Sequence, residues 1–241
     1  MMNSEIGSLM VECRKNGTAI PAFNYSDMWD LKAIITAAAR HSVPVMVASN
    51  PLVARSLGVD LCQAMVEAMR RNAPIRVFSH LDHNLDPELC FLAIEAGYDS
   101  VMIDGSVSEE DDFLARVDDV VQLVGQTGVD ILAVGIGTAH GFYQGDPKIH
   151  FDRLEEISKA VEIPLVLPGG TGIADEDIRR AIRLGICKVN VGAIIHTTYM
   201  TALRDALNGT GGNPYTLDIM SRMLPEIEKT VESRIRAVAG R

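Results

Sequence analysis

Two histidines and two aspartates crowd into the ten residues VFSHLDHNLD, 77–86, directly behind an apolar run. Three of these residues, His80, Asp82 and His83, stand almost side by side. Imidazole nitrogens bind divalent metals such as zinc, and imidazoles and carboxylates exchange protons with substrates. A histidine such as His80 is, taken alone, more often a hydrogen-bonded core residue. The combination of these residue types at the end of a buried run is what indicates a reactive site.

A second stretch that could do chemistry is IPLVLPGGTG, 163–172, in which an apolar run ends in Pro168 and a glycine-rich turn. Glycine lets backbone N–H groups approach an anion closely, and a helix starting near Asp175 would add the positive end of its dipole. The turn could also be purely structural. Because it follows a strand and opens a helix, anion binding is favoured, and a side chain in place of Gly170 would occupy the anion's space.

Short β-rich runs alternate with amphipathic helical stretches along the chain. We expect strands at 19–24, 44–49, 75–80, 100–105, 130–137, 163–168 and 187–192. We expect helices at 28–41, 60–71, 87–96, 112–124, 153–161, 174–184 and 225–240. The strand runs are nearly continuous in apolar residues, which is typical of parallel strands buried on both faces. The alternation therefore predicts an α/β protein with a barrel or a doubly wound sheet.

Polar or glycine residues follow the predicted strands at their carboxyl ends. In a barrel these ends surround one mouth, whereas in a doubly wound sheet they line a linear crevice. We predict a TIM (β/α) barrel in which seven strands, one fewer than usual, can be counted. No Pro/Ser-rich linker divides the chain, so we predict a single barrel domain over 1–241. The residues expected at the mouth are Asn24, Ser49, His80–His83, Asp104, Ser106, His140, Gly169–Gly172 and Asn190.

The composition narrows the class of protein. A formal net charge of -10 argues against nonspecific binding to nucleic acid or to an anionic membrane. No apolar run approaches the roughly 20 residues that span a bilayer, and the N-terminal residues contain no signal-peptide core. The four cysteines, Cys13, Cys62, Cys90 and Cys187, are scattered without metal-binding spacing. We expect buried, reduced thiols in a cytoplasmic protein.

Five motifs in order resemble the class II fructose-bisphosphate and tagatose-bisphosphate aldolase family. They are AFNYSD, HLDH, SVMIDGS, VDILAVGIGTAHGFYQG and PLVLPGGTGIADEDIRRAIRLGICKVNVG. HLDH alone would be a weak signal, but the order of all five is specific. The similarity covers roughly Ala19 to Gly192, which is most of the chain.

The resemblance implies a reaction and a site. It implies reversible, zinc-dependent cleavage of a ketose bisphosphate into dihydroxyacetone phosphate and an aldehyde phosphate, with zinc or another divalent metal as Lewis acid. A monovalent cation and a homo-oligomer, dimer or tetramer, would accompany it. Asp82 matches the acid/base residue, and His83 and His140 match metal ligands. Residues matching substrate or phosphate contacts are Asn24, Ser49, Gly141, Gly169, Gly170, Thr171, Gly172 and Asn190, with Asp104 and Ser106 as secondary candidates.

Three departures from the family pattern qualify this function. Pro168, which has no donor atom, replaces a metal-binding histidine. The strand that would carry a metal-associated glutamate is missing, either because the barrel was shortened in evolution or because this sequence lacks a segment. After Asn190 the chain offers Ala193 and Ile194 instead of a hydroxyl and an acidic residue. An alternative function is therefore a catalytically impaired phosphosugar-binding or accessory protein, and a weaker one is a different metal-dependent lyase or isomerase.

Overall fold

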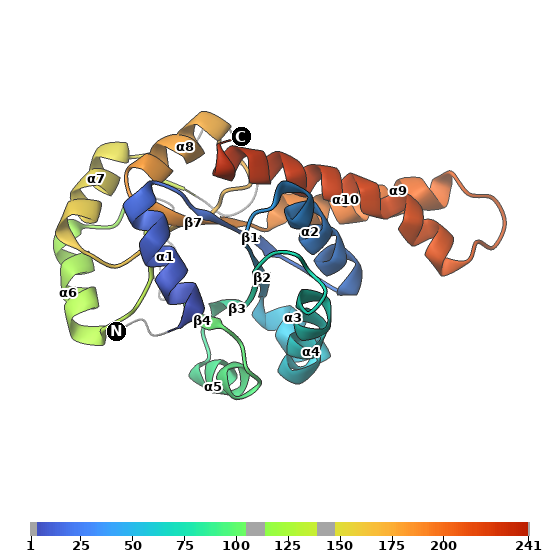
Figure 1. The fold of residues 1–241 in the computed structure, drawn as a ribbon, viewed down its shortest axis with the longest axis horizontal. Helices are drawn as coiled ribbons and strands as arrows, with labels where there is room; N and C mark the ends of the chain where they lie inside the picture. Colours follow the sequence, from blue (N-terminus) through green and yellow to red (C-terminus); the bar gives the residue numbers. More distant parts are fainter. Residues whose placement is uncertain (1–3, 105–113, 139–147, 241) are drawn as a thin grey trace. The chain divides into compact units, whose positions relative to one another are not determined.

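A computed structural model describes residues 4–104, 114–138 and 148–240 of the chain. Its strands form a seven-stranded sheet in the order β4-β3-β2-β1-β7-β6-β5 (Figure 1). Every pair with a described register is parallel, as in Ala22 with Met46 and Leu132 with Leu165. The predicted α/β barrel class, with seven strands, is therefore confirmed. The strands are β1 (Ile20–Asn24), β2 (Val45–Ser49), β3 (Val77–Asn84), β4 (Ser100–Ile103), β5 (Leu132–Ala133), β6 (Leu165–Leu167) and β7 (Ile186–Val191).

At least one helix lies between every two consecutive strands in the described residues. They are α1 (Glu5–Asn16), α2 (Met28–His41), α3 (Pro51–Leu57), α4 (Val59–Arg70), α5 (Pro87–Glu95), α6 (Val117–Thr127), α7 (Phe151–Ala160), α8 (Asp175–Arg183), α9 (Ala193–Asn208) and α10 (Thr216–Ala239). Local caps explain several boundaries. Asp27 and Asp30 form a capping box at the start of α2, and Pro51 opens α3 behind the Asn50 cap.

Some predicted boundaries are wrong. The third strand does not end at His80 but continues to Asn84, so that Asp82 and His83 belong to the strand itself. The strand expected over 130–137 is reduced to Leu132–Ala133, and α6 begins at Val117 instead of residue 112. The closing helix starts at Thr216 and continues through Pro225. Helices α1, α3 and α9 were not predicted.

The chain divides into two compact units, each assembled from separate stretches of sequence. The first unit comprises Met1–Pro21, Ser106–Val191 and Ala237–Arg241, and the second comprises Ala22–Gly105 and Gly192–Arg236. In the first unit, the Arg14 guanidinium of α1 donates to the carbonyl oxygens of Ser158 (2.6 Å), Val161 (2.7 Å) and Ile163. These bonds fix α1 to the end of α7. A single domain over 1–241 stays a prediction.

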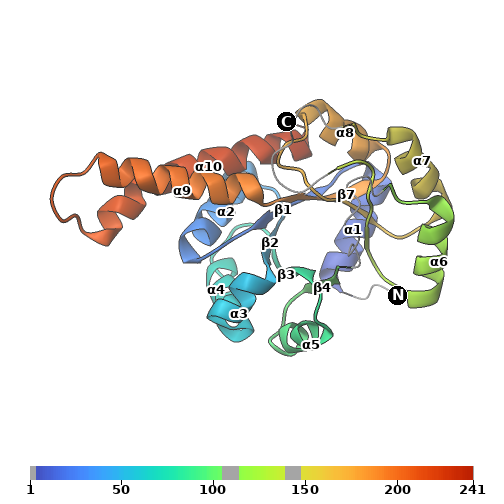
Figure 2. The same ribbon diagram turned by 180° about the vertical axis from the view of Figure 1, so that it is seen from behind.

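The second unit holds β2 to β4 and most of β1, with helices α2 to α5. Its helices pack on the sheet through a buried cluster that includes Leu81 of β3, Cys90 of α5 and Tyr98. Helices α9 and α10 run side by side (Figures 1 and 2), joined by a 3.2 Å contact between the Thr198 and Thr230 hydroxyls. All four cysteines are buried and free, as expected. Among the described helices, none has both the length and the apolar character needed to cross a membrane.

Candidate active site

The end of β3 is irregular at the residues singled out by sequence. Leu81 packs into the cluster beneath the helices, so strand alternation directs His80 and Asp82 to the opposite face of the sheet. The register with β4 then shifts between Leu81 and Asn84, and His83 has a φ of 51°. A left-handed conformation is unfavourable for a side chain with a Cβ atom, and such strain clusters at functional sites. This irregularity turns the His83 side chain away from the direction that it would have in a regular strand.

Asp82 lies at the centre of a group of polar side chains in the second unit, of which Asp82 and His80 are buried. Its carboxylate is 1% exposed and accepts a 2.9 Å hydrogen bond from Asn24 Nδ2, at the end of β1. His80 Nε2 lies 3.5 Å from Asp82 Oδ1, and His83 Nε2 lies 3.8 Å from Asp82 Oδ2. His80 is buried, and its Nδ1 bonds to the Ser100 hydroxyl at 2.7 Å. The structure thus brings Asn24, His80, Asp82 and His83 together, and His80 is the buried, hydrogen-bonded residue that was expected.

Asp104, a secondary candidate, joins this group through His83. The distance from its Oδ2 to His83 Nδ1 is 2.8 Å. A carboxylate on one ring nitrogen sets the tautomer and the orientation of the imidazole, so the nitrogen that would coordinate a metal is Nε2. The backbone supports the same arrangement, because the Asp104 N–H donates to the Asn84 carbonyl at 2.8 Å.

Ser49 lies in a different environment from the one expected for a substrate contact. It is fully buried, and its hydroxyl is 2.9 Å from the Tyr98 hydroxyl. Ser49 pairs with Leu81 in the β2–β3 register, which places it on the helix-covered face, opposite Asp82. Burial raises the pKa of Tyr98 to about 12 and that of the nearby Cys62 thiol above its usual range. Neutral groups therefore surround Ser49, and its hydroxyl has a structural partner.

The glycine turn of the first unit is held against β7. Gly169 has a φ of 70°, and the Gly170 N–H donates to the Asn190 carbonyl at 2.8 Å. A Cβ atom on Gly170 would come within 2.7 Å of that carbonyl oxygen and 2.8 Å of Val189 Cγ1. A side chain at this position would therefore meet β7, which the sequence did not predict, and its effect on an anion stays a prediction. Gly170 permits the close packing of the turn on the strand.

Asn190 and Thr171 are the two buried polar side chains of this turn region. Both are 7% exposed. Within the described residues, neither the Asn190 amide nitrogen nor its oxygen has a hydrogen-bond partner. An unsatisfied buried amide costs about 1–3 kcal/mol, so a polar ligand at Asn190 would be favoured. The sequence prediction for Asn190 thus has an independent structural reason behind it.

Helix α8 contributes less to anion binding than its position suggests. It starts at Asp175, as expected, and its first turn carries Asp175, Glu176 and Asp177. These carboxylates already interact favourably with the positive end of the helix dipole and repel a further anion. Affinity for phosphate would have to come mainly from the turn and from Asn190.

The described residues supply only part of a metal site. His83, oriented by Asp104, fits a ligand role, whereas Pro168 offers no donor atom. Across 4–104, 114–138 and 148–240, no three His, Cys, Asp or Glu side chains converge as a metal-binding group. The predicted residues His140, Gly141 and Ser106 fall outside these ranges.

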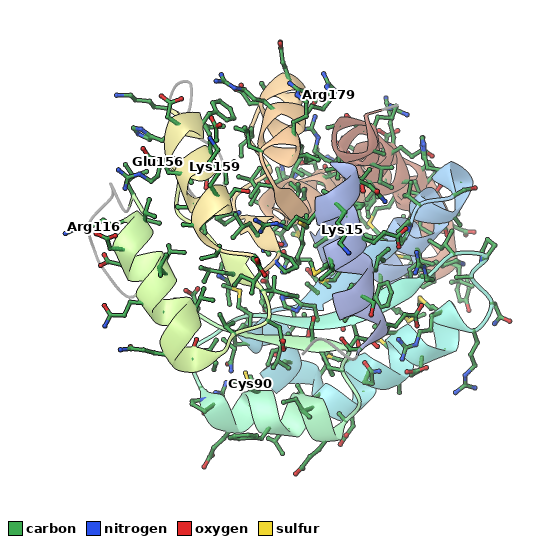
Figure 3. The ribbon with its side chains drawn as sticks, turned by 60° about the vertical axis from the view of Figure 1, so that its left-hand side comes forward. Lys15, Cys90, Arg116, Glu156, Lys159 and Arg179 are labelled. Carbon is green, nitrogen blue, oxygen red and sulfur yellow. The ribbon has the colours of Figure 1, made fainter. Side chains whose placement is uncertain are left out.

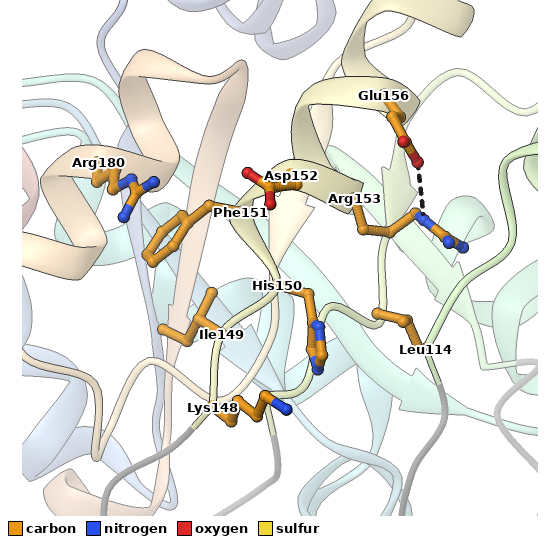
Figure 4. A pocket seen from close by; sticks show the side chains of 9 residues that line it. All are labelled: Leu114, Lys148, Ile149, His150, Phe151, Asp152, Arg153, Glu156 and Arg180. Carbon is orange, nitrogen blue, oxygen red and sulfur yellow. Dashed lines mark hydrogen bonds and ion pairs between the residues drawn. The ribbon is translucent and has the colours of Figure 1, made fainter.

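A separate cavity of about 430 Å³ opens at the start of α7 in the first unit (Figure 4). The Arg180 guanidinium stacks over the Phe151 ring at 4.0 Å, and Arg153 pairs with Glu156 at 3.0 Å. Its lining contains none of the predicted site residues and mixes basic and acidic side chains. The lining residues are Leu114, Lys148, Ile149, His150, Phe151, Asp152, Arg153, Glu156 and Arg180. This cavity is therefore distinct from the residues around Asp82.

Comparisons with known proteins agree on one family. The family model for class-II fructose-bisphosphate aldolase matches residues 4–112 and 107–240. A 6-phospho-5-dehydro-2-deoxy-D-gluconate aldolase of Bacillus licheniformis is 32% identical over 273 aligned positions, covering 95% of this chain and 92% of the relative. The crystal structure of the YdjI aldolase from Escherichia coli K12 is similar, with a TM-score of 0.87 at 25% identity. The match covers 98% of this chain and 97% of the YdjI chain. A fructose-bisphosphate aldolase from Campylobacter jejuni, 18% identical, has the same fold, with a TM-score of 0.83 over 97% and 94%.

Proposed function

Because the chain belongs to the class II fructose-bisphosphate aldolase family, we propose that it catalyses reversible, metal-dependent aldol cleavage of a phosphorylated keto sugar, with Asp82 as the acid/base residue. For a ketose bisphosphate the products are dihydroxyacetone phosphate and an aldehyde phosphate. The named relative suggests a phosphorylated keto acid as a further substrate to test. The observation that carries the proposal is the polar group in which Asn24 and Asp104 flank the buried Asp82 and the half-buried His83.

Each residue of this group has a separate task. Asp82 exchanges a proton with a substrate hydroxyl during cleavage. The Asn24 amide, bonded to one carboxylate oxygen, holds that carboxylate in place. His83 would bind the metal through Nε2 while Asp104 orients the ring, and His140 is the second proposed ligand. When bound, zinc or another divalent ion would stabilise negative charge on the substrate oxygens as a Lewis acid. A monovalent cation is a further proposed cofactor.

The phosphate end of the substrate is assigned to the first unit. Gly169, Thr171, Gly172 and Asn190 are the proposed contacts, with Gly141 as an additional one. Gly170 is a weaker candidate, because its N–H already donates to the Asn190 carbonyl. The Asn190 amide, which has no hydrogen-bond partner among the described residues, supports this assignment. Ser49 is a weaker candidate, because its hydroxyl is already bonded to Tyr98. Ser106, outside the described residues, is a secondary candidate.

Mutation of Asp82 tests the catalytic role. Asp82→Asn keeps the shape of the side chain and its contact with Asn24, but it cannot accept a proton in the same way. We expect loss of cleavage with an unchanged thermal unfolding midpoint. The control variant Asn72→Gln, which changes an exposed residue, should retain full activity. Activity of Asp82→Asn close to that of the wild type would contradict the role.

Pro168 favours a second candidate function, phosphosugar binding without catalysis, because it removes one metal donor. The variant Pro168→His restores a donor at the end of β6 and separates the two functions. If the chain is an enzyme weakened at this position, zinc affinity and cleavage should both rise. If it is a binding protein, Pro168→His should leave cleavage at zero while wild-type protein still binds dihydroxyacetone phosphate in calorimetry.

We also propose a cytoplasmic location and a homo-oligomeric state. Four free, buried cysteines suit a reducing compartment. The family membership supports a sugar-phosphate partner, and the acidic net charge gives no support to nucleic-acid or membrane partners. Sedimentation of the purified chain would test the oligomeric state.

A further inference from the structure

A lysine is buried in β7, within the first unit. Lys188 is 3% exposed, and all six residues of β7 are buried. Among the residues that the structure describes, it is the one lysine or arginine that is buried. The other described cations are partly or fully exposed and most lie on helices, as Lys15 of α1 and Lys159 of α7 do in Figure 3. Because lysines are among the residues least often buried, this position indicates that the charge itself is used.

Strand geometry directs Lys188 to the same face of β7 as Asn190. The register of β7 with β6 is irregular just before Lys188 and regular from Lys188 to Val189. Irregularities of this kind turn side chains and are frequent beside active sites. Residues two apart on a strand share a face, so the opposite face carries Val189 and Val191. A Cβ atom on Gly170 would meet both valine side chains. Lys188 and Asn190 therefore point away from the packing between the turn and β7.

Together, Lys188 and Asn190 are suited to an anionic oxygen. The Asn190 side chain is buried, and its amide has no hydrogen-bond partner among the described residues. A strand rises about 3.3 Å per residue, so Asn190 lies about 7 Å beyond Lys188, a distance that the four-carbon stem of a lysine nearly spans. The ammonium group offers three donors and a charge, and the amide nitrogen offers two donors. Such a set of donors binds a charged acceptor best.

The glycine turn needs the charge that Lys188 carries. The turn itself and Asn190 offer neutral donors, and the first turn of α8 is acidic. A phosphorylated substrate brings a phosphate group with about -1.5 to -2 charges at pH 7. Away from bulk water, a cation beside such an anion contributes more than it would on the surface. A buried lysine two residues before Asn190 supplies this positive charge.

We propose that Lys188 is a further substrate-binding residue, whose ammonium group holds an anionic oxygen of the phosphorylated keto sugar together with the Asn190 amide. This inference rests on the proposed function, from which it takes the class of substrate. The oxygen belongs either to the phosphate or to the reacting end, where negative charge develops during cleavage. Both oxygens have the same chemistry, but only the first kind is present in inorganic phosphate.

Calorimetry with dihydroxyacetone phosphate tests the contact. Lys188→Met removes the charge and keeps an unbranched side chain, so binding should weaken at least about 10-fold. Lys188→Arg keeps the charge and should bind more tightly than Lys188→Met. The matched control is Lys159→Met, because the Lys159 side chain is 73% exposed on α7, and its affinity should equal that of the wild type.

Inorganic phosphate identifies which oxygen Lys188 holds. If it is a phosphate oxygen, the affinity for inorganic phosphate should fall in Lys188→Met in parallel with that for dihydroxyacetone phosphate. If it is an oxygen at the reacting end, the affinity for inorganic phosphate should stay constant while kcat falls. A double-mutant cycle tests the shared contact, because Lys188→Met and Asn190→Leu together should weaken dihydroxyacetone phosphate binding by less than the product of their separate effects.

A measurement on the wild type keeps the test independent of these variants. In crystals soaked with dihydroxyacetone phosphate, Lys188 Nζ should lie about 2.7–3.2 Å from an oxygen of the ligand. A bound ligand with no oxygen in that range would overturn the proposal, as would Lys188→Met with the affinity and kcat/KM of Lys159→Met. Equal losses in Lys188→Met and Lys188→Arg, with a lowered unfolding midpoint in both, would also overturn it, because Lys188 would then serve only the packing of β7. A wild type that binds dihydroxyacetone phosphate through Lys188 but cleaves no keto sugar would refute the catalytic function and leave this contact intact.

Discussion

Replacing Gly170 by alanine is expected to destabilise the glycine turn strongly. The added Cβ atom would lie 2.7 Å from the Asn190 carbonyl oxygen and 2.8 Å from Val189 Cγ1, so the turn or β7 must shift. Overpacking of this kind costs about 1–3 kcal/mol. The shift would also weaken the 2.8 Å bond from the Gly170 N–H to Asn190, worth about 1 kcal/mol. We therefore expect a loss of about 2–4 kcal/mol in the free energy of unfolding.

Urea and thermal unfolding measure this loss directly. For a chain of this size, the loss corresponds to a midpoint lowered by roughly 5–15 °C. The control is Gly125→Ala in α6, where an added Cβ atom meets nothing within 4 Å. Because alanine forms helices better than glycine, that variant should gain about 0.5–1 kcal/mol. The reasoning is refuted if Gly170→Ala unfolds at the wild-type denaturant concentration.

Three further variants probe the second unit. Burial raises the pKa of Asp30 to about 6 from 3.8, so the folded state holds its proton more tightly. The resulting contribution to the free energy of unfolding is fully present below about pH 4 and is lost, by about 3 kcal/mol, as the pH rises through about 6. Urea unfolding between about pH 4 and 7 should show this loss in the wild type and not in Asp30→Asn. Asp104→Ala should lower zinc affinity roughly 10–100-fold in calorimetry, because His83 loses its orienting bond; equal affinities would contradict the ligand role. Gly192→Ala places a Cβ atom 2.8 Å from Asn24 Oδ1, so kcat/KM should fall about 10-fold or more, and an unaffected rate would show that Asn24 need not stay fixed.

The alternation of strands and helices was predictable because it is a local pattern. Apolar runs such as 44–49 predict buried parallel strands, and the structure contains a strand at Val45–Ser49. The third strand itself was also predictable, but its end was not, because the strand continues past His80 and contains Asp82 and His83. Helix α3 was missed because its seven residues are too few for a periodic signal.

The detailed geometry of the site was not predictable from local sequence. The bond between Asn24 and Asp82 joins residues far apart in the chain, and only the packing of β1 near β3 brings them together. The left-handed conformation of His83 violates the local preference of a histidine, so no propensity could indicate it. Ser49 lies at a strand end as expected, but its side chain points to the face of the sheet that holds Tyr98. Because side chains alternate along a strand, a difference of one position places a side chain on the opposite face.

The apolar residues of α5 illustrate a different limit. The sequence of this helix reads as a buried element, and its predicted range of 87–96 agrees closely with Pro87–Glu95. Periodicity does not reveal that Phe91, Leu92 and Ile94 of this helix are exposed, because it does not show which neighbouring elements cover a helix face.

Cleavage by the wild-type protein tests the central claim most directly. The purified chain, loaded with zinc, would be given fructose bisphosphate, tagatose bisphosphate and 6-phospho-5-dehydro-2-deoxy-D-gluconate, and the release of carbonyl products would be followed with and without a chelator. The account predicts cleavage of at least one of these substrates that depends on the metal and disappears in Asp82→Asn. The account would be contradicted if the zinc-loaded wild type cleaved none of the three substrates while it still bound dihydroxyacetone phosphate.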